Sequence, residues 1–487
     1  MKRLTSLNSV TGAAQLPGYD PDAHGRGIVH LGIGAFHRAH QAMMTDDALA
    51  ASGGDWRITG VSLRSLEIAE ALNAQHGLYT LIERGAQGTR ARVIASIRDV
   101  IAADPAATLA ALCAPEIRIV TLTVTEKGYG LDRIKGGPDL NHPAVSADLA
   151  SPNAPSGVLG LLVRALAQRR QSGQAPFSVL SCDNLPDNGR LLRSGVVGLA
   201  RIWDPGLADW IETEVAFPSS MVDRITPATT SQTLSDAARV TGCTDLAAVE
   251  TEPFLQWVIE DRFPTGRPAW EAGGALFVKD VAPYEQMKLT MLNGSHSMLA
   301  YAGFLSGRRY VRDVMEDPAL ARLVRRHLET AATLLPVLSG INLHDYARSL
   351  EARFRNPAIA HETRQIAMDG TQKLPQRIFK PALLALERNL PLNTFAFATA
   401  AWMRYAIGRD DNGEPYAISD PREAEITTAL RNIPYEAQAI IAALNALQGL
   451  IPPALSQHPR WSTAVERALE RMLTDGMIRA IAYEAEK

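Results

Sequence analysis

The pattern of hydrophobic residues changes near residue 280, and this change constrains the fold more than any other feature. Before it, short apolar or β-branched runs alternate with helix-like stretches; the runs are GIVHLGIGAF (27–36), WRITGVSL (56–63), EIRIVTLTV (116–124) and PFSVLSCDN (176–184). Such alternation favours a mainly parallel sheet with covering helices. After GGALFVKDVAPYEQ (273–286), apolar residues recur at helical spacing. We therefore predict an α/β doubly wound domain over residues 1–280 and a mainly α-helical domain over residues 281–487.

Composition limits the class of partner. A chain of 487 residues with 46% hydrophobic residues is too long for one core, and its net charge of −3 gives no general attraction to nucleic acid or anionic membranes. A small-molecule partner is therefore expected, and the sequence does not fix the oligomeric state. The three cysteines, Cys113, Cys182 and Cys243, form no paired motif, which predicts a reducing, cytoplasmic setting and no zinc site. No apolar signal segment or membrane span is predicted.

A glycine turn follows the first strand-like run. Gly32, Ile33 and Gly34 lie between an apolar strand and a helix-like stretch that begins with Ala35 and Phe36. In Rossmann-type domains this turn lets backbone amides approach a dinucleotide pyrophosphate at a helix N-terminus. The third glycine of the G-x-G-x-x-G motif is replaced by His37, and glycine pairs also end strands for ordinary reasons. We predict that these five residues contact a nicotinamide cofactor.

Two charged residues after the second strand bear on the choice of cofactor. Glu67 stands where an acid would accept hydrogen bonds from the adenosine ribose, which favours NAD over NADP. Arg64 favours the opposite choice because a guanidinium suits a 2′-phosphate. Both side chains would also fit a solvated helix start. NAD is the predicted cofactor.

The stretch KLTMLNGSHS (288–297) places three polar side chains in an apolar segment. On an α-helix at ~100° per residue, Lys288 and His296 fall ~80° apart, with Asn293 ~60° beyond His296. A desolvated lysine can act as a general base, an amide can hold an oxyanion, and a histidine can orient a substrate. Alternatively, Lys288 extends to solvent, Asn293 marks a helix break at Gly294, and His296 is a satisfied core residue. Taken singly, each residue fits the second interpretation better, and three on one face make the two interpretations about equally favoured.

Polar residues also follow two strands of the predicted sheet. Asp183 and Asn184 come directly after PFSVL, and Glu126 and Lys127 follow EIRIVTLTV. In doubly wound sheets, ligands bind at the carboxyl ends of strands, so these residues are placed to face a cofactor or substrate. An Asp-Asn pair before Leu-Pro is also an ordinary exit from a strand into a loop.

Taken together, these segments resemble the polyol-specific long-chain dehydrogenase family, which includes mannitol 2-dehydrogenases and fructuronate reductases. The segments that carry the resemblance occur in consistent order; they are IVHLGIGAFHRAHQA, TVTEKGY, SCDNLPDNG, FPSSMVDRITPA, EPFLQWVIEDRFPTGRPAW, PYEQMKLTMLNGSHS, AMDGTQKLPQR and AWMRYAIGRDDNG. The resemblance implies metal-independent hydride transfer between a secondary alcohol and NAD.

The family pattern K-x4-N-x2-H is met by Lys288, Asn293 and His296. The resemblance implies Lys288 as the general base and His296 as a substrate-orienting residue. It implies Asn293 with Asn184 as the amides that bind the oxyanion. Glu285 matches a glutamate that gates proton exchange between the lysine and solvent.

Three further positions match binding residues of the family. Glu67 matches the acid that disfavours NADP, Asp223 matches a residue beside the cofactor, and Lys373 matches a lysine that contacts substrate. The segments TVTEKGY and QIAMDGTQKLPQR look more like the fructuronate reductase (D-mannonate oxidoreductase) branch than the mannitol branch. The mannitol branch more often has Gly at Lys127 and Arg at Gln365.

Two alternatives to a uronate enzyme stay open. In the favoured interpretation, the carboxylate of a sugar acid would be met by Lys127, Lys373 or Arg377. The first alternative is D-mannitol 2-dehydrogenase or a related polyol dehydrogenase. The second is a catalytically silent NAD-binding regulator on the same fold, which the intact polar constellation disfavours.

Overall fold

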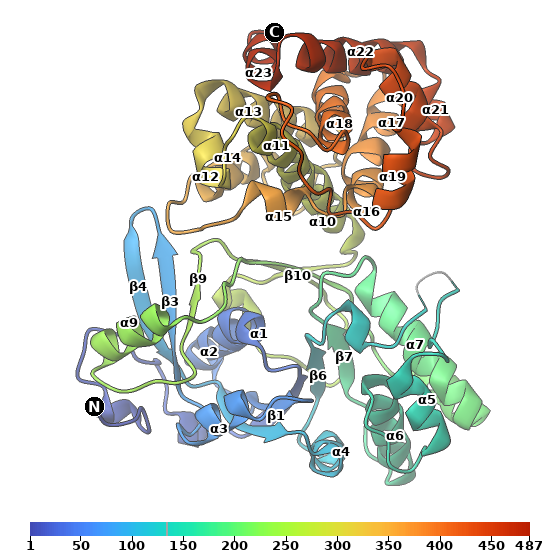
Figure 1. Ribbon diagram of the computed structural model, residues 1–487. Coiled ribbons are helices and arrows are strands. Elements are labelled where there is room, and N and C mark those ends of the chain that lie inside the picture. The colour runs from blue at the N-terminus through green and yellow to red at the C-terminus, as the bar shows by residue number, and fades with distance from the viewer. Residues whose placement is uncertain (133–134) are drawn as a thin grey trace. The chain divides into compact units, whose positions relative to one another are not determined.

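The computed structural model describes residues 1–132 and 135–487 and divides into two compact units. The N-terminal unit comprises Met1–Ala282 and the helical unit comprises Pro283–Lys487, and their elements are labelled in Figure 1. Within the described residues, no helix is both long and apolar enough to cross a membrane.

A five-stranded parallel sheet organises the N-terminal unit. Its strands lie in the order β5-β2-β1-β6-β7, and their bounds are β1 Arg26–Leu31, β2 Arg57–Ser62, β5 Ile97–Ala102, β6 Ile119–Leu122 and β7 Ser178–Ser181. The four sequence runs become β1, β2, β6 and β7. Chain order reverses direction on the two sides of β1, so a switch point lies between the carboxyl ends of β1 and β6.

Helices cover both faces of this sheet, because alternate strand residues point to opposite sides. Val29 and Leu31 belong to one core with α4 (Pro105–Cys113) and α6 (Val158–Gln171). Ile28 belongs to a second core with α2 (Gln41–Ser52). The predicted doubly wound α/β domain is confirmed.

Two three-stranded sheets accompany the large one, and sequence analysis did not predict them. One has the order β4-β3-β9, with β3 Tyr79–Gly85, β4 Gly88–Ile94 and β9 Val249–Thr251; the other has the order β11-β10-β8, with β8 Ser220–Asp223, β10 Gln256–Glu260 and β11 Leu276–Val278.

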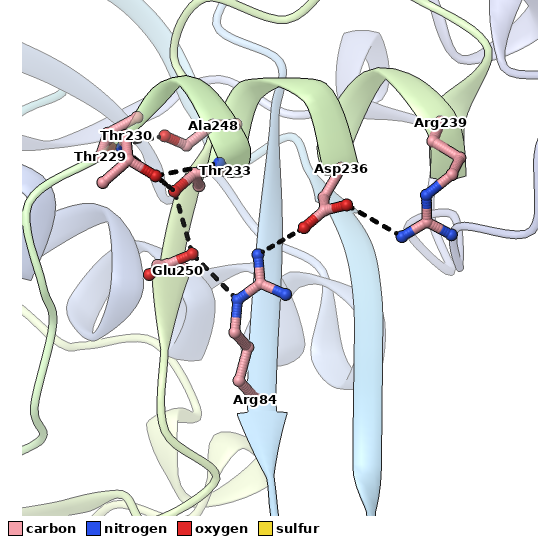
Figure 2. A network of polar contacts seen from close by, with 8 residues as sticks. All are labelled: Arg84, Thr229, Thr230, Thr233, Asp236, Arg239, Ala248 and Glu250. Atoms are coloured by element: carbon pink, nitrogen blue, oxygen red, sulfur yellow. Dashed lines mark hydrogen bonds and ion pairs between the residues drawn. The ribbon is translucent and has the colours of Figure 1, made fainter. Parts of the chain in front are cut away.

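A polar network fastens α9 (Ser231–Thr241) to the first of these small sheets (Figure 2). Arg84 on β3 forms ion pairs with Asp236 at 2.8 Å and with Glu250 on β9 at 2.9 Å. Glu250 also accepts a hydrogen bond from Thr233 at 2.9 Å. Arg84 thus joins strands and a helix that are about 150 or more residues apart in the chain, a link that local sequence patterns do not reveal.

The helical unit is built around two central helices, α11 (Gly294–Leu305) and α18 (Asn393–Ala406), which pack on each other. Both are buried on nearly all sides, as expected for helices at the centre of a domain. The surrounding α-helices are α10 Ala282–Met287, α12 Val311–Glu316, α13 Pro318–Thr333, α14 Leu343–Phe354, α15 Thr363–Ala367, α16 Gly370–Leu374, α17 Lys380–Glu387, α19 Glu423–Ala429, α20 Ala437–Asn445, α21 Pro453–Ser456, α22 Pro459–Thr474 and α23 Met477–Ala485. The predicted mainly helical C-terminal architecture is confirmed.

Candidate active site

The glycine turn lies at the switch point of the large sheet. Gly32 has φ +99°, and a Cβ added there would lie 2.1 Å from the carbonyl oxygen of Thr123, so this position requires glycine. The amides of Gly32 and Ile33 both donate to the carbonyl of Val61, at 2.9 and 3.1 Å. The turn is therefore fixed against the carboxyl ends of both β2 and β6.

His37, which replaces the third glycine, has a packing role. Its buried ring stacks on His30 with 3.4 Å between ring centroids. The two ring nitrogens of His30 lie 2.7 Å from Thr121 Oγ1 and 2.9 Å from Thr123 Oγ1. Burial lowers the pKa of His30 to about 3 and holds that of His37 well below its usual value, so both rings are neutral. The pair is joined to the glycine turn because His30 Nε2 lies 3.1 Å from the carbonyl oxygen of Gly32.

The helix after the turn is short. α1 comprises only Ala35–Ala39, and α2 begins after His40. The side chain of Ile33 is buried against Gly60, so Ile33 contributes its backbone atoms to the turn. Ala35 and Phe36 are half-buried.

The remaining predicted cofactor residues lie on other elements of the N-terminal unit. Arg64 and Glu67 are exposed just after β2, and Glu67 is the first residue of α3 (Glu67–Asn73). Asp223 ends β8 in a different sheet from the glycine turn. Its strand partner Gln256 places a carbonyl 2.9 Å from His40 Nε2, beside the segment that follows the turn.

Asn184 and Lys127 follow adjacent strands of the large sheet. Asn184 is exposed three residues after β7, and Lys127 lies in the short 3-10 helix Glu126–Gly128 after β6. These two residues therefore share the carboxyl edge of the sheet with the glycine turn. Lys288, Asn293, His296, Lys373 and Arg377 all belong to the helical unit.

A π-helical turn, η5 (Lys288–Asn293), begins at Lys288 and ends at Asn293. This finding corrects the α-helical arc assumed from the sequence. In a π-helix the backbone hydrogen bond runs from i to i+5, so residues five apart take the relation that i and i+4 have in an α-helix. Lys288 and Asn293 are five apart. The K-x4-N spacing therefore places both on one face, where an α-helix would separate them by ~140°. Glu285 lies on α10, just before this turn.

Gly294 marks a close contact, and the helix continues through it into α11. A Cβ at Gly294 would lie 2.9 Å from Nε2 of His327 and 3.0 Å from the carbonyl oxygen of Arg377. Arg377 belongs to a second π-helical turn, η6 (Pro375–Phe379), which packs against η5. Glycine at this position thus lets the two π-helical turns approach each other.

His296 is the centre of a basic group of side chains. It is 8% exposed, and its ring lies 4.8 Å from Phe354 and 5.4 Å from His361, measured between ring centroids. Burial, and then the neighbouring basic side chains of His361, Arg353, Arg377 and Lys373, hold the pKa of His296 well below its usual value. His296 is therefore neutral at physiological pH.

The cations of this group are themselves partly desolvated. Burial lowers the pKa of Arg377 to about 10, and its Nη1 lies 3.5 Å from Ser297 Oγ. Burial also lowers the pKa of Lys373, whose Nζ donates to the carbonyl of Met368 at 2.6 Å. Desolvated cations that repel one another favour the binding of an anion.

Sequence analysis missed Arg353 and His361. Arg353 had a detectable signal, because it stands on the apolar face of α14 in step with Tyr346 and Leu350 and is only 7% exposed. A charged residue on an apolar helical face is uncommon unless it is used. His361 lies in a loop without a periodic pattern, so the sequence offers no such signal for it.

No group of three or more His, Cys, Asp or Glu side chains in residues 1–132 and 135–487 could hold a metal ion.

Comparisons with known proteins cover nearly the whole chain. Residues 26–272 match the family model for the mannitol dehydrogenase Rossmann domain, and residues 280–473 match the model for the mannitol dehydrogenase C-terminal domain. D-mannonate oxidoreductase of Escherichia coli is 42% identical over 473 residues, which cover 96% of this chain and 97% of that protein. The uncharacterized oxidoreductase YeiQ of the same organism is 42% identical, with 96% of each chain covered.

A solved structure is similar over the full length. The structure of Pseudomonas fluorescens mannitol 2-dehydrogenase in ternary complex with NAD and D-mannitol has 37% sequence identity to this chain and a TM-score of 0.82. The similarity covers 100% of this chain and 99% of that one.

Proposed function

The chain belongs to the mannitol dehydrogenase family, and from this premise we propose an NAD(H)-dependent oxidoreductase that acts on an open-chain C6 sugar acid. The reaction interconverts a secondary alcohol and a ketone, D-mannonate and D-fructuronate. The observation that carries the choice of substrate is the basic group around His296, formed by Arg353, His361, Lys373 and Arg377.

In the proposed mechanism, the glycine turn at Gly32–Gly34 would hold NAD(H), which would supply the hydride acceptor for the alcohol or the hydride donor for the ketone. Lys288 takes the hydroxyl proton during oxidation and gives it back during reduction. The amides of Asn184 and Asn293 donate hydrogen bonds to the developing oxyanion, and neutral His296 orients the substrate. Glu285 lies on α10, just before Lys288, and passes the proton between the lysine and solvent.

Several features support NAD as the cofactor. The φ of +99° at Gly32 and its packing on Thr123 form a tight turn, while an added Cβ at Gly34 would meet nothing nearer than Gly32 O at 3.8 Å. The open backbone at Gly34 fits the approach of a pyrophosphate. Glu67 would accept from the ribose hydroxyls and repel a 2′-phosphate, and a related enzyme was solved with NAD.

Alanine substitutions at the two glycines are expected to separate cofactor binding from folding. Gly34→Ala should fold normally, because the position has an ordinary φ of −86° and open space. Its methyl group would occupy pyrophosphate space, so KM for NADH should rise about 10-fold or more, or about 1.4 kcal/mol. Gly32→Ala should instead lower Tm by several degrees, about 4 °C or more, through collision with Thr123. Unchanged KM in Gly34→Ala would count against the cofactor position.

The carboxylate assignment follows from charge. Arg353, Lys373 and Arg377 are cations whose fields act on one buried histidine. A sugar carboxylate would form charge-assisted hydrogen bonds with such groups, which a hydroxymethyl group cannot form. The 42% identity to a D-mannonate oxidoreductase supports the same choice.

D-Mannitol 2-dehydrogenase is the alternative, and one contact favours it. Lys373 Nζ lies 3.7 Å from Asp369 Oδ2, so part of its charge already has a partner. The full-length similarity to P. fluorescens mannitol 2-dehydrogenase supports this alternative as well.

A substrate panel tests the proposal. With NADH, kcat/KM for D-fructuronate should exceed that for D-fructose about 100-fold, since two lost charged hydrogen bonds cost about 3 kcal/mol. Arg377→Gln should lower kcat/KM for D-fructuronate and spare D-fructose, while the exposed Arg364→Gln serves as the matched control. Preference for D-fructose would support the mannitol enzyme. NADH binding without turnover of either sugar would support the silent regulator.

A further inference from the structure

Asp183 precedes the proposed oxyanion residue Asn184 and binds the segment that follows the neighbouring strand. Its Oδ2 accepts hydrogen bonds from the amide of Val124 at 2.9 Å and from the hydroxyl of Tyr129 at 2.7 Å. The amide of Thr125 also donates to this carboxylate. One carboxylate therefore joins the ends of β6 and β7. The two joined residues, Val124 and Asp183, are 59 positions apart in the chain.

The segment held by Asp183 has a strained backbone. Thr125 has φ +65°, a conformation that β-branched residues rarely adopt. Such a conformation persists only where surrounding contacts fix it. The hydrogen bonds from Val124 and Thr125 to Asp183 supply those contacts, immediately before Glu126 and Lys127.

Tyr129 is a further donor to Asp183, and we call the Asp183 carboxylate together with these donors the clamp. Tyr129 is 1% exposed, and its hydroxyl lies 2.7 Å from Ser181 Oγ as well as from Asp183 Oδ2. Because both partners belong to β7 or its exit, Tyr129 ties the loop after β6 to the strand end that carries Asn184.

Asn188 fixes the same chain from the other side. Its buried amide donates to the carbonyls of Ser220 at 2.7 Å and Asp183 at 3.1 Å. Its Oδ1 accepts from the amide of Ser220 at 2.9 Å. The side chain of Asp183 thus binds the segment after β6, and its carbonyl accepts from Asn188, which in turn pairs with Ser220 of β8. Both sets of contacts lie one residue before Asn184.

We propose that Asp183, with Tyr129 as its donor, is a positioning residue that holds the Asn184 amide in the geometry needed to bind the oxyanion. This inference rests on the proposed function, because it assigns Asn184 to the developing oxyanion. In this role Asp183 acts through Asn184. Its carboxylate fixes the peptide that presents Asn184 and, through Val124 and Thr125, sets that peptide against the loop after β6.

A double-mutant cycle tests this role with the full-length enzyme. Asp183→Asn keeps the size of the side chain but weakens its accepting power, since hydrogen bonds to charged groups are about twice as strong as neutral ones. We expect kcat with D-fructuronate and NADH to fall about 10-fold, with a smaller change in KM for NADH. Asn184→Ala should lower kcat about 100-fold. The double variant should match Asn184→Ala within about 3-fold, because Asp183 acts through Asn184.

Control variants separate this role from loss of folding. Asp187→Asn, in the same loop with φ +53° and an exposed carboxylate, should leave kcat and Tm unchanged. If Asp183→Asn lowers Tm strongly, Tyr129→Phe replaces it in the cycle, since it removes one donor and keeps the carboxylate.

The outcomes distinguish the inference from the proposed function. If the losses of the two single variants multiply in the double variant, the clamp is wrong while the oxyanion assignment of Asn184 stands. If Asn184→Ala turns over normally, the oxyanion assignment is wrong and the clamp falls with it. If the double variant is no slower than Asn184→Ala, both are supported.

Discussion

Lys288→Ala is expected to lower kcat about 100- to 10,000-fold, the contribution that a positioned general base makes to proton transfer. The half-buried lysine begins the π-helical turn η5, so its removal leaves no side chain at that position to accept the hydroxyl proton. KM for NADH should change little, because the predicted cofactor residues all lie in the N-terminal unit. Steady-state kinetics with D-fructuronate and D-fructose measure both quantities.

Two controls strengthen this test. Lys380→Ala removes an exposed lysine from the start of α17 and should leave kcat unchanged. Added methylamine should restore part of the activity of Lys288→Ala, because a small amine can occupy the space of the missing side chain and accept the hydroxyl proton in its place. Near-normal turnover of Lys288→Ala with both sugars would show that another group is the base.

The large sheet could be predicted because its signals are local. Each parallel strand is buried on both faces and therefore appears as a continuous apolar run, as in the segment that forms β1. The glycine turn is equally local, because Gly32 and Gly34 stand directly after an apolar strand in the sequence; the contact with the carbonyl of Thr123 that requires glycine at Gly32 is visible only in the fold. The small sheets were missed because their pairings join distant segments, such as β3 with β9.

Part of the candidate site could be predicted from the sequence for a similar reason. Lys288, Asn293 and His296 stand out as polar residues in an apolar stretch, which the sequence shows directly. The π-helical turn that brings Lys288 and Asn293 to one face was not predicted, because apolar periodicity does not distinguish a π-helical turn within an α-helix; in the fold this turn packs against η6. Arg353 contributes charge from a separate helix, so only the fold reveals its proximity to His296.

Removal of the Asn293 amide, proposed to bind the oxyanion, is the second large effect that we expect. Asn293→Ala should lower kcat about 100- to 1,000-fold, the usual loss when one donor to an oxyanion is removed. Asn293→Asp should be at least as slow, because a carboxylate of the same size would repel the developing negative charge. The exposed Asn412→Ala is the matched control for asparagine loss.

Combining this substitution with Asn184→Ala tests whether the two amides act on one oxygen. If both donate to the same oxyanion, each single variant already loosens its geometry, so the double variant should be less impaired than the product of the single losses. Independent multiplication of the losses would place the two amides on different atoms of the substrate. A value of kcat within about 3-fold of the unsubstituted enzyme in Asn293→Ala, where 3-fold is under 1 kcal/mol, would remove Asn293 from the oxyanion site altogether.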